Sequence, residues 1–473
     1  MTALAIGLAL AALPVGWALV ALTAVILTVL AFVEPMVGLA AALVIGPLKP
    51  LEIYLSVHLP LDAGQIVLLV TLAAWFAHTV AHRRRLLPAG PLLVPLLIFV
   101  GAASLSLPSA LSMGDALTEL AKWAQMILVM VLVVRQADTA RWRWHTIIAI
   151  VLGVATFQAL VGIWQFAFKG SGPAHFEILG RFYRAYGSFE QPNPYGGFMS
   201  IGLLLAAGLA IFAAEQALRE RTLAAVGRLT GPVGLCALLG AALVMSWSRG
   251  AWLGAAAGGL AILLAWPRRW WVGVGLVAGG AAVGLLALQM GALPASVADR
   301  LMGFTELTQT FDVRGVDITS ANYAVTERLA HWQAAQEMAR FHPWVGIGFG
   351  NYAAVYPDYA LMNWPEPLGH AHNYYLNLLA EIGVIGLAAY LALWVVVIAV
   401  TWRTTRRSEG LPRAMALGLL GVWVYLCVHQ MVDYLYVANL HMHFGALLGV
   451  LAILAMRAGV QEKTEQNRRH GEA

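Results

Sequence analysis

The chain has 473 residues, of which 60% are hydrophobic and only 11% are charged, and its formal net charge is +5. A soluble globular protein is usually about a quarter charged, so this composition excludes an ordinary soluble domain. Apolar runs of about 20 residues, the length that crosses a bilayer, recur along the chain. The sequence therefore predicts an all-α polytopic membrane protein.

Residues 1–48 are apolar but are interrupted by Pro14, Glu34 and Pro35. These interruptions allow one, two or three membrane spans, and one span is the preferred interpretation. No Lys or Arg precedes the first apolar run, and no small-residue cleavage site is evident. We therefore expect the N-terminus to be retained rather than removed as a signal peptide.

From residue 63 onward, eleven segments are expected to span the membrane: 63–80, 91–107, 114–134, 143–168, 194–216, 231–247, 250–266, 270–290, 371–402, 412–432 and 441–456. One earlier span makes about 12 in total, and 12–14 are possible. Basic residues gather in alternate connections, which the positive-inside rule places in the cytoplasm. The chain then divides into N-terminal spans (1–290), an external loop (291–370), C-terminal spans (371–456) and a cytoplasmic tail (457–473).

The external loop has about 80 residues, and connections of that length are usually functional or disordered. Its aromatic residues argue against disorder, and part of it is amphipathic: the apolar stripe consists of Leu329, Trp332, Ala335 and Met338. This spacing predicts a helix of about four turns, which Pro343 ends. We expect the loop to be a partly helical lid over the external membrane face.

Two arginines are expected on the external side, against the positive-inside bias. Arg249 occupies the tight turn SWSRGAWLG, and Arg328 lies near the start of the loop helix. Either could be an ordinary interfacial or solvated side chain. The sharper hypothesis is that both bind one phosphate group, because the planar guanidinium suits phosphate oxygens. This hypothesis predicts that they converge on one external cavity.

His370 and His372 begin the stretch LGHAHNYYLNLLAEIGVIG, where the loop re-enters the membrane. If a helix begins near His370, two glycines, Gly383 and Gly386, lie below His372 and leave a groove for a neighbouring helix or a lipid chain. Tyr375 would then lie within about 60° of His372 around the helix axis. His370 would then point about 160° away from His372. A lone interfacial histidine is usually structural, but His372 is the best external candidate for a general base.

Other candidates are weaker. His429 and Asp433 form an (i, i+4) pair, for which a structural hydrogen bond is the preferred interpretation. Asn193 is expected to cap a helix that has Pro194 in its first turn. His441 and His443 offer too few ligands for a metal site, and nothing in the external loop argues for a bound divalent cation.

Together, these motifs resemble those of the bacterial O-antigen ligase and polysaccharide polymerase family. The family signature is a His, then Asn, Ser or Gln, nine residues, Gly, two residues, and Gly, Thr or Tyr. His372, Asn373, Gly383 and Gly386 match it. The remaining family-like motifs are the turn Ser248-Arg249-Gly250, the loop arginine Arg328 ahead of Trp332 and His342-Pro343, and the pair Pro192-Asn193. They span about residues 186–386.

The resemblance implies a GT-C-like glycosyltransferase in the bacterial cytoplasmic membrane, with its active site facing the periplasm. Such an enzyme passes a glycan from a polyprenyl diphosphate to a hydroxyl on the lipid A core, another glycan or a protein. It works by a single inverting displacement in the lipid bilayer, without metal, cofactor or nucleic acid. His372 is the expected catalytic residue. The expected substrate-binding residues are Arg249, Arg328, His370, Asn373, Tyr375, Asn193, Gly383 and Gly386.

The acceptor stays open, so ligase, chain polymerase and protein O-oligosaccharyltransferase are alternatives within the family. A transporter of an anionic solute is the alternative from a different class. Transporters place charged or discontinuous helices near the bilayer midplane, whereas the candidate residues here are expected at the external interface. This difference favours the enzyme.

Overall fold

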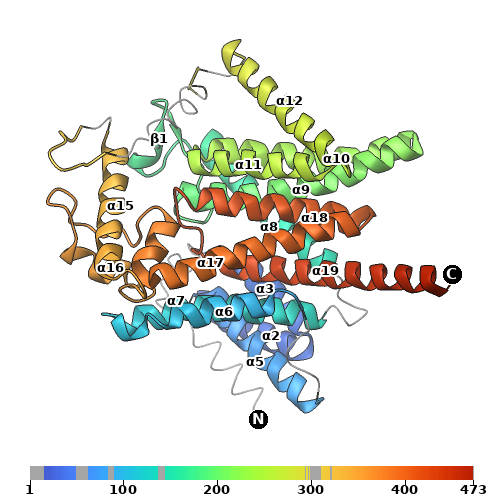
Figure 1. The fold of residues 1–473 in the computed structure, drawn as a ribbon, viewed down its shortest axis with the longest axis horizontal. Coiled ribbons are helices and arrows are strands. Elements are labelled where there is room, and N and C mark those ends of the chain that lie inside the picture. The colour runs from blue at the N-terminus through green and yellow to red at the C-terminus, as the bar shows by residue number, and fades with distance from the viewer. Residues whose placement is uncertain are drawn as a thin grey trace.

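The computed structural model describes residues 15–48, 62–83, 90–136, 144–292, 295–296, 298, 311–319 and 322–471. Residues 1–14, on which the expected retention of the N-terminus depends, lie outside these ranges. The described part forms a bundle of mostly parallel and antiparallel helices (Figure 1). The helices of this bundle are α2 (Val15–Val33), α3 (Pro35–Ile45), α5 (Ala63–Ala81), α6 (Leu93–Ser104), α7 (Met113–Gln136), α8 (Trp144–Ala167), α9 (Pro192–Glu220), α10 (Leu223–Met245), α11 (Arg249–Ala265), α12 (Trp270–Gln289), α17 (Tyr374–Arg407), α18 (Gly410–His429) and α19 (Leu440–Gly471).

Within the described residues, nine helices are long and apolar enough to cross a membrane, and three shorter apolar helices, Pro35–Ile45, Leu93–Ser109 and Arg249–Ala265, add to them. Each of the eleven segments expected after residue 62 corresponds to one of the helices α5 to α19. The prediction of an all-α polytopic membrane protein is confirmed. The apolar N-terminal region contains two helices that meet at Glu34 and Pro35, and α3, with 11 residues, is shorter than the roughly 20 that a span needs.

The centre of the bundle is formed by α18 and α19, which are 67% and 72% buried over their most apolar windows. α18 packs against α9, α11 and α17, and α19 packs against α7. By contrast, α12 is only 6% buried over its window and lies at the edge (Figure 1). The most buried helices therefore include α18, whose end and following connection carry the buried polar residues His429 and Asp433.

The external loop crosses one end of the bundle. Its main helix, α15 (Tyr323–Phe341), lies across the ends of the spanning helices, and α16 (Tyr352–Val355) and a 3₁₀ turn (Tyr356–Asp358) follow at the same end (Figure 1). α15 stops at Phe341, just before Pro343, as the sequence predicted. A small antiparallel pair, β1 (Glu177–Ile178) and β2 (Phe182–Tyr183), lies in the connection before α9, with Glu177 opposite Tyr183.

At the far end of α11, two of the basic connections meet. Arg268 forms an ion pair with Glu409 at 2.9 Å, and Arg406 donates to the carbonyl of Pro267 at 2.6 Å. The connections between α11 and α12 and between α17 and α18 therefore lie on the same side of the bundle, as the alternating spans required. The positive-inside rule predicts that this side is cytoplasmic.

A break in α17 attaches the loop to the bundle. Gly383 has a φ of 63° and a ψ of −171°, so the helix is interrupted there. The freed backbone pairs with the loop: Val384 N–H donates to the Pro343 carbonyl at 2.8 Å, and Gly348 N–H donates to the Glu381 carbonyl at 3.0 Å. A Cβ on Gly346 would lie 2.3 Å from the Glu381 backbone. The glycine-rich stretch after Pro343 is thus needed for close backbone approach.

Candidate active site

The two histidines of the re-entry stretch lie just before α17, not inside it. The helix begins at Tyr374, because Asn373 caps it by accepting hydrogen bonds from the Tyr375 and Leu376 N–H groups, both at 3.1 Å. Asparagine is a strong N-cap residue, so it sets the helix start. The expectation that the helix begins near His370 is therefore wrong, and the helical faces assigned from that start do not apply.

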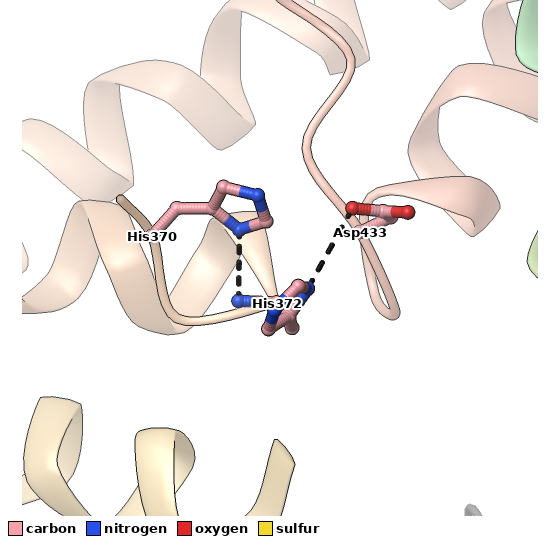
Figure 2. A group of neighbouring side chains, drawn as sticks. All are labelled: His370, His372 and Asp433. Atoms are coloured by element: carbon pink, nitrogen blue, oxygen red, sulfur yellow. Dashed lines mark hydrogen bonds and ion pairs between the residues drawn. The ribbon is translucent and has the colours of Figure 1, made fainter. Parts of the chain in front are cut away.

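Without a helix between them, the two imidazoles are neighbours. Their ring centroids are 4.4 Å apart, whereas a helix that included both residues would have pointed them away from each other. His372 has a φ of 51°, a left-handed conformation that is uncommon outside glycine. Its N–H donates to His370 Nδ1 at 3.0 Å (Figure 2). His370 therefore stabilises the backbone conformation that orients the His372 side chain.

The His372 ring faces a buried carboxylate. His372 Nδ1 lies 3.9 Å from Asp433 Oδ1, which belongs to the connection after α18 (Figure 2). This nitrogen is buried and has no hydrogen-bond partner among the described residues. Burial opposes the ionisation of Asp433, but the neighbouring His372, His370 and His429 outweigh it, so its pKa is lowered. Asp433 is thus held as a carboxylate beside the imidazole.

Three arginines and this carboxylate line one pocket, which we call the arginine pocket. Its volume is about 130 Å³, and it is lined by Arg184, Asn193, Ser248, Arg249, Gly250, Ala324, Arg328, His429, Val432 and Asp433. Arg249 is the first residue of α11, and Arg328 comes from α15. The prediction that these two arginines converge on one cavity is confirmed.

Arg184 comes from the connection before α9. Its Nη2 donates to Asn193 Oδ1 at 3.0 Å, and its Nε donates to the Ser246 carbonyl at 3.0 Å. Arg184 was not among the residues predicted from the sequence, although an arginine in an external connection was the same signal that singled out Arg249. Asn193 is not the expected cap, because α9 begins at Pro192 with Gln191 as its N-cap. Instead, Asn193 lies in the first helical turn and faces the pocket.

A larger cavity of about 370 Å³, which we call the histidine cavity, adjoins the arginine pocket. Among its lining residues are His370, His372 and Tyr434, and it shares Asn193 and Asp433 with the arginine pocket. His370 and Tyr434 also line a third, acidic cavity of about 180 Å³ that contains Asp115, Glu119 and Glu381. Three polar cavities therefore follow one another at the end of the bundle that α15 covers.

Four predicted site residues do not line these cavities. The Asn373 side chain is used as the helix cap, and the Tyr375 hydroxyl donates to the Cys427 carbonyl at 2.8 Å. A Cβ on Gly383 would lie 2.3 Å from the Trp344 backbone, and one on Gly386 would meet the Ile382 side chain. The groove expected beside these glycines is therefore filled by the protein itself, because the loop packs into the break in α17.

His370, His372 and Asp433 are also the three residues, within the described part of the chain, that could hold a metal ion, since one ligand atom from each lies within 4.8 Å of the others. His370 Nδ1, however, accepts a hydrogen bond from a backbone N–H. Burial and the nearby His372 lower the pKa of His370 to about 4, so at neutral pH its one proton is on Nε2. A histidine that binds metal through Nε2 donates from Nδ1, so this hydrogen-bond pattern does not favour metal binding through Nε2 of His370.

The fold and the site define a polytopic helical membrane protein with an arginine pocket beside a His–Asp pair at one end of its bundle. Residues 234–391 match the family model described as O-Antigen ligase. This segment contains Arg249, Arg328 and His372, and its similarity to the O-antigen ligase family agrees with the resemblance that the motifs indicated. The match supports a glycosyltransferase of the ligase or polymerase type. A search of curated proteins found no match to this chain.

Proposed function

We propose that this protein transfers a glycan from a polyprenyl diphosphate carrier to an acceptor hydroxyl at the external face of the bacterial cytoplasmic membrane. The observation that carries the proposal is that the arginine pocket and the histidine cavity share Asp433 and Asn193. An anion in the first would lie directly beside a base in the second. Glycan transfer needs the groups that bind the diphosphate and the base that activates the acceptor to lie on either side of the same sugar C1 atom.

The arginine pocket is proposed to bind the diphosphate. Among the described residues, its lining has three arginines and the carboxylate of Asp433, so positive side chains predominate there. A glycan-linked diphosphate carries two negative charges, and a third develops as the sugar C1–O bond breaks. Arginines aimed at this oxygen stabilise the transition state more than the ground state. The N-terminus of α11 points the positive end of its helix dipole into the same pocket.

His372 is proposed to be the general base. With Nδ1 facing Asp433, its Nε2 is left to take the proton from the acceptor hydroxyl. The hydroxyl oxygen forms a bond to C1 of the sugar, the C1–O bond to phosphate breaks, and its electron pair leaves with the diphosphate. One displacement of this kind inverts the anomeric centre. Asp433 would stabilise the imidazolium, as the carboxylate of a hydrolase triad does.

The remaining site residues are proposed to place the substrates. Asn193 lies between the two cavities and can orient a group that passes from one to the other.

No metal is needed in this scheme, because the arginines balance the negative charge of the diphosphate that a divalent cation would otherwise balance. The acceptor is a glycan, the lipid A core or a protein hydroxyl, and deletion in the native host followed by analysis of lipopolysaccharide, free polysaccharide and glycoproteins distinguishes them.

The proposal is tested by turnover of a lipid-linked glycan by the purified protein in detergent, measured as release of polyprenyl diphosphate. A variant carrying both Arg249→Ala and Arg328→Ala should lose turnover. Arg340→Ala, an exposed arginine on the same helix as Arg328, is the matched control and should keep it. Turnover that survives the double substitution would refute the phosphate assignment. A protein inactive in detergent that moves an anion into sealed vesicles would be the transporter instead.

A further inference from the structure

His429, the last residue of α18, lies at the arginine pocket in a position that the proposed reaction does not use. The ring is fully buried, yet it lines the pocket. Its Nδ1 contacts the Tyr425 hydroxyl. Its Nε2 has no hydrogen-bond partner among the described residues. The expected side-chain hydrogen bond to Asp433 is not formed, because the Asp433 carboxylate faces His372 and the Tyr434 N–H instead.

The unpartnered nitrogen faces the start of α11. A Cβ placed on Gly250, the residue after Arg249, would lie 3.6 Å from His429 Nε2. Buried polar atoms of native proteins almost always have a partner, so one that lacks it in a polar pocket indicates a ligand. The ligand has to be an anion, since three arginines line the same pocket.

We infer that His429 is a further ligand of the diphosphate, donating a hydrogen bond from Nε2 to a phosphate oxygen. The inference rests on the proposed function, because it takes the arginine pocket as the diphosphate site. In this inference the Tyr425 hydroxyl donates to Nδ1, so the one proton of a neutral imidazole is on Nε2, beside Gly250 of the pocket lining. Tyr425 is thus a positioning residue that selects the donor tautomer.

This role differs from that of the arginines. A neutral imidazole donates a directional hydrogen bond but adds no charge. Because the His429 ring is buried against the start of α11, it fixes where a phosphate oxygen can lie. The guanidinium groups of Arg184 and Arg328 come from connecting segments, whereas His429 belongs to one of the most buried helices of the bundle. His429 therefore holds one phosphate oxygen in a fixed position while the arginines bind the rest of the diphosphate.

The test is equilibrium binding of farnesyl diphosphate, a short polyprenyl diphosphate, to the full-length protein in lipid nanodiscs. His429→Phe keeps a ring but removes the donor, and it should weaken binding about tenfold or more, as expected for loss of a hydrogen bond to a charged group. His429→Gln, whose amide reaches the place of Nε2, should stay within about threefold of the wild type. His429→Asn, whose amide reaches only the place of Nδ1, should bind like His429→Phe.

His443→Phe is the matched control, because His443 is a buried histidine on α19 that packs against Phe198 rather than lining the arginine pocket. It should bind farnesyl diphosphate like the wild type. If His429→Phe does not fold, the Gln and Asn pair still decides, since both keep a polar side chain. Wild-type binding by His429→Phe or His429→Asn would refute the inference alone. Failure of the wild type to bind, or unchanged binding after Arg249→Ala with Arg328→Ala, would refute the proposed diphosphate site as well.

Discussion

Replacing Asp433 with Asn removes the charge that faces His372 while keeping the shape of the side chain. The two groups are 3.9 Å apart, and at an effective dielectric constant of about 20 a pair of unit charges at that distance interacts by about 4 kcal/mol. A general base gains its positive charge as it accepts the proton, so this attraction acts mainly in the transition state. It corresponds to roughly a thousandfold in rate, and screening by water reduces the expected loss of kcat to about 10²- to 10³-fold.

The assay is steady-state turnover of a lipid-linked glycan, with kcat and KM determined separately. The KM for the donor should stay unchanged or fall, because Asp433→Asn also removes a carboxylate from the lining of the arginine pocket. Asp358→Asn, at an exposed site in the 3₁₀ turn of the loop, is the matched control and should leave both constants unchanged. A kcat within about threefold of the wild type would refute the pairing of Asp433 with a proton-accepting His372.

The remaining predictions use the same purified protein. His372→Ala should lower kcat by about 10² to 10⁴, the usual effect of losing a general base, and near-normal turnover by His372→Gln would show instead that the residue only positions substrate. His370→Ala should lower kcat by less, since its ring supports the His372 backbone, and an effect as large as that of His372→Ala would argue against this supporting role. Dialysis against EDTA should leave turnover unchanged, whereas a loss restored by a divalent cation would assign His370, His372 and Asp433 to a metal. Burial lowers the pKa of His331 to about 3 and that of His370 to about 4. Below about pH 6.5 the unfolded chain therefore takes up protons at these histidines before the folded protein does. The melting temperature should then fall as the pH decreases from about 6.5 to 4, and it should fall less in His331→Phe.

The sequence was sufficient for the spanning helices, because each needs a long apolar run that few other structures require. It also identified Arg249 and Arg328, since a cation on the external side departs from the positive-inside bias. The same rule applied to the connection before α9 would have found Arg184. Choosing Arg184 over Arg181, three residues earlier in the same connection, needs the tertiary contacts with Asn193 and Ser246.

Helix ends were harder to predict, and the error at α17 changed the geometry of the site. An apolar run shows where a helix can form, but its first residue depends on which side chain caps it. Asn373 caps α17, so His370 and His372 precede the helix and their rings lie together. For the same reason, the spacing from His372 to Gly383 does not define one helical face. Gly383 marks the break at which the loop carrying Arg328 is attached.

The sequence by itself determined the class of protein, the all-α bundle and two of the three arginines, because hydropathy and charge are properties of short segments. Only the tertiary structure decided which polar groups meet. Asp433 faces His372 because the connection after α18 packs beside the start of α17, and His429 lines the arginine pocket with its Nδ1 against the Tyr425 hydroxyl and its Nε2 near Gly250. Such pairings depend on contacts between residues that are distant in sequence or on the rotation of a side chain. A local pattern of apolar and charged residues specifies neither the contact nor the rotation.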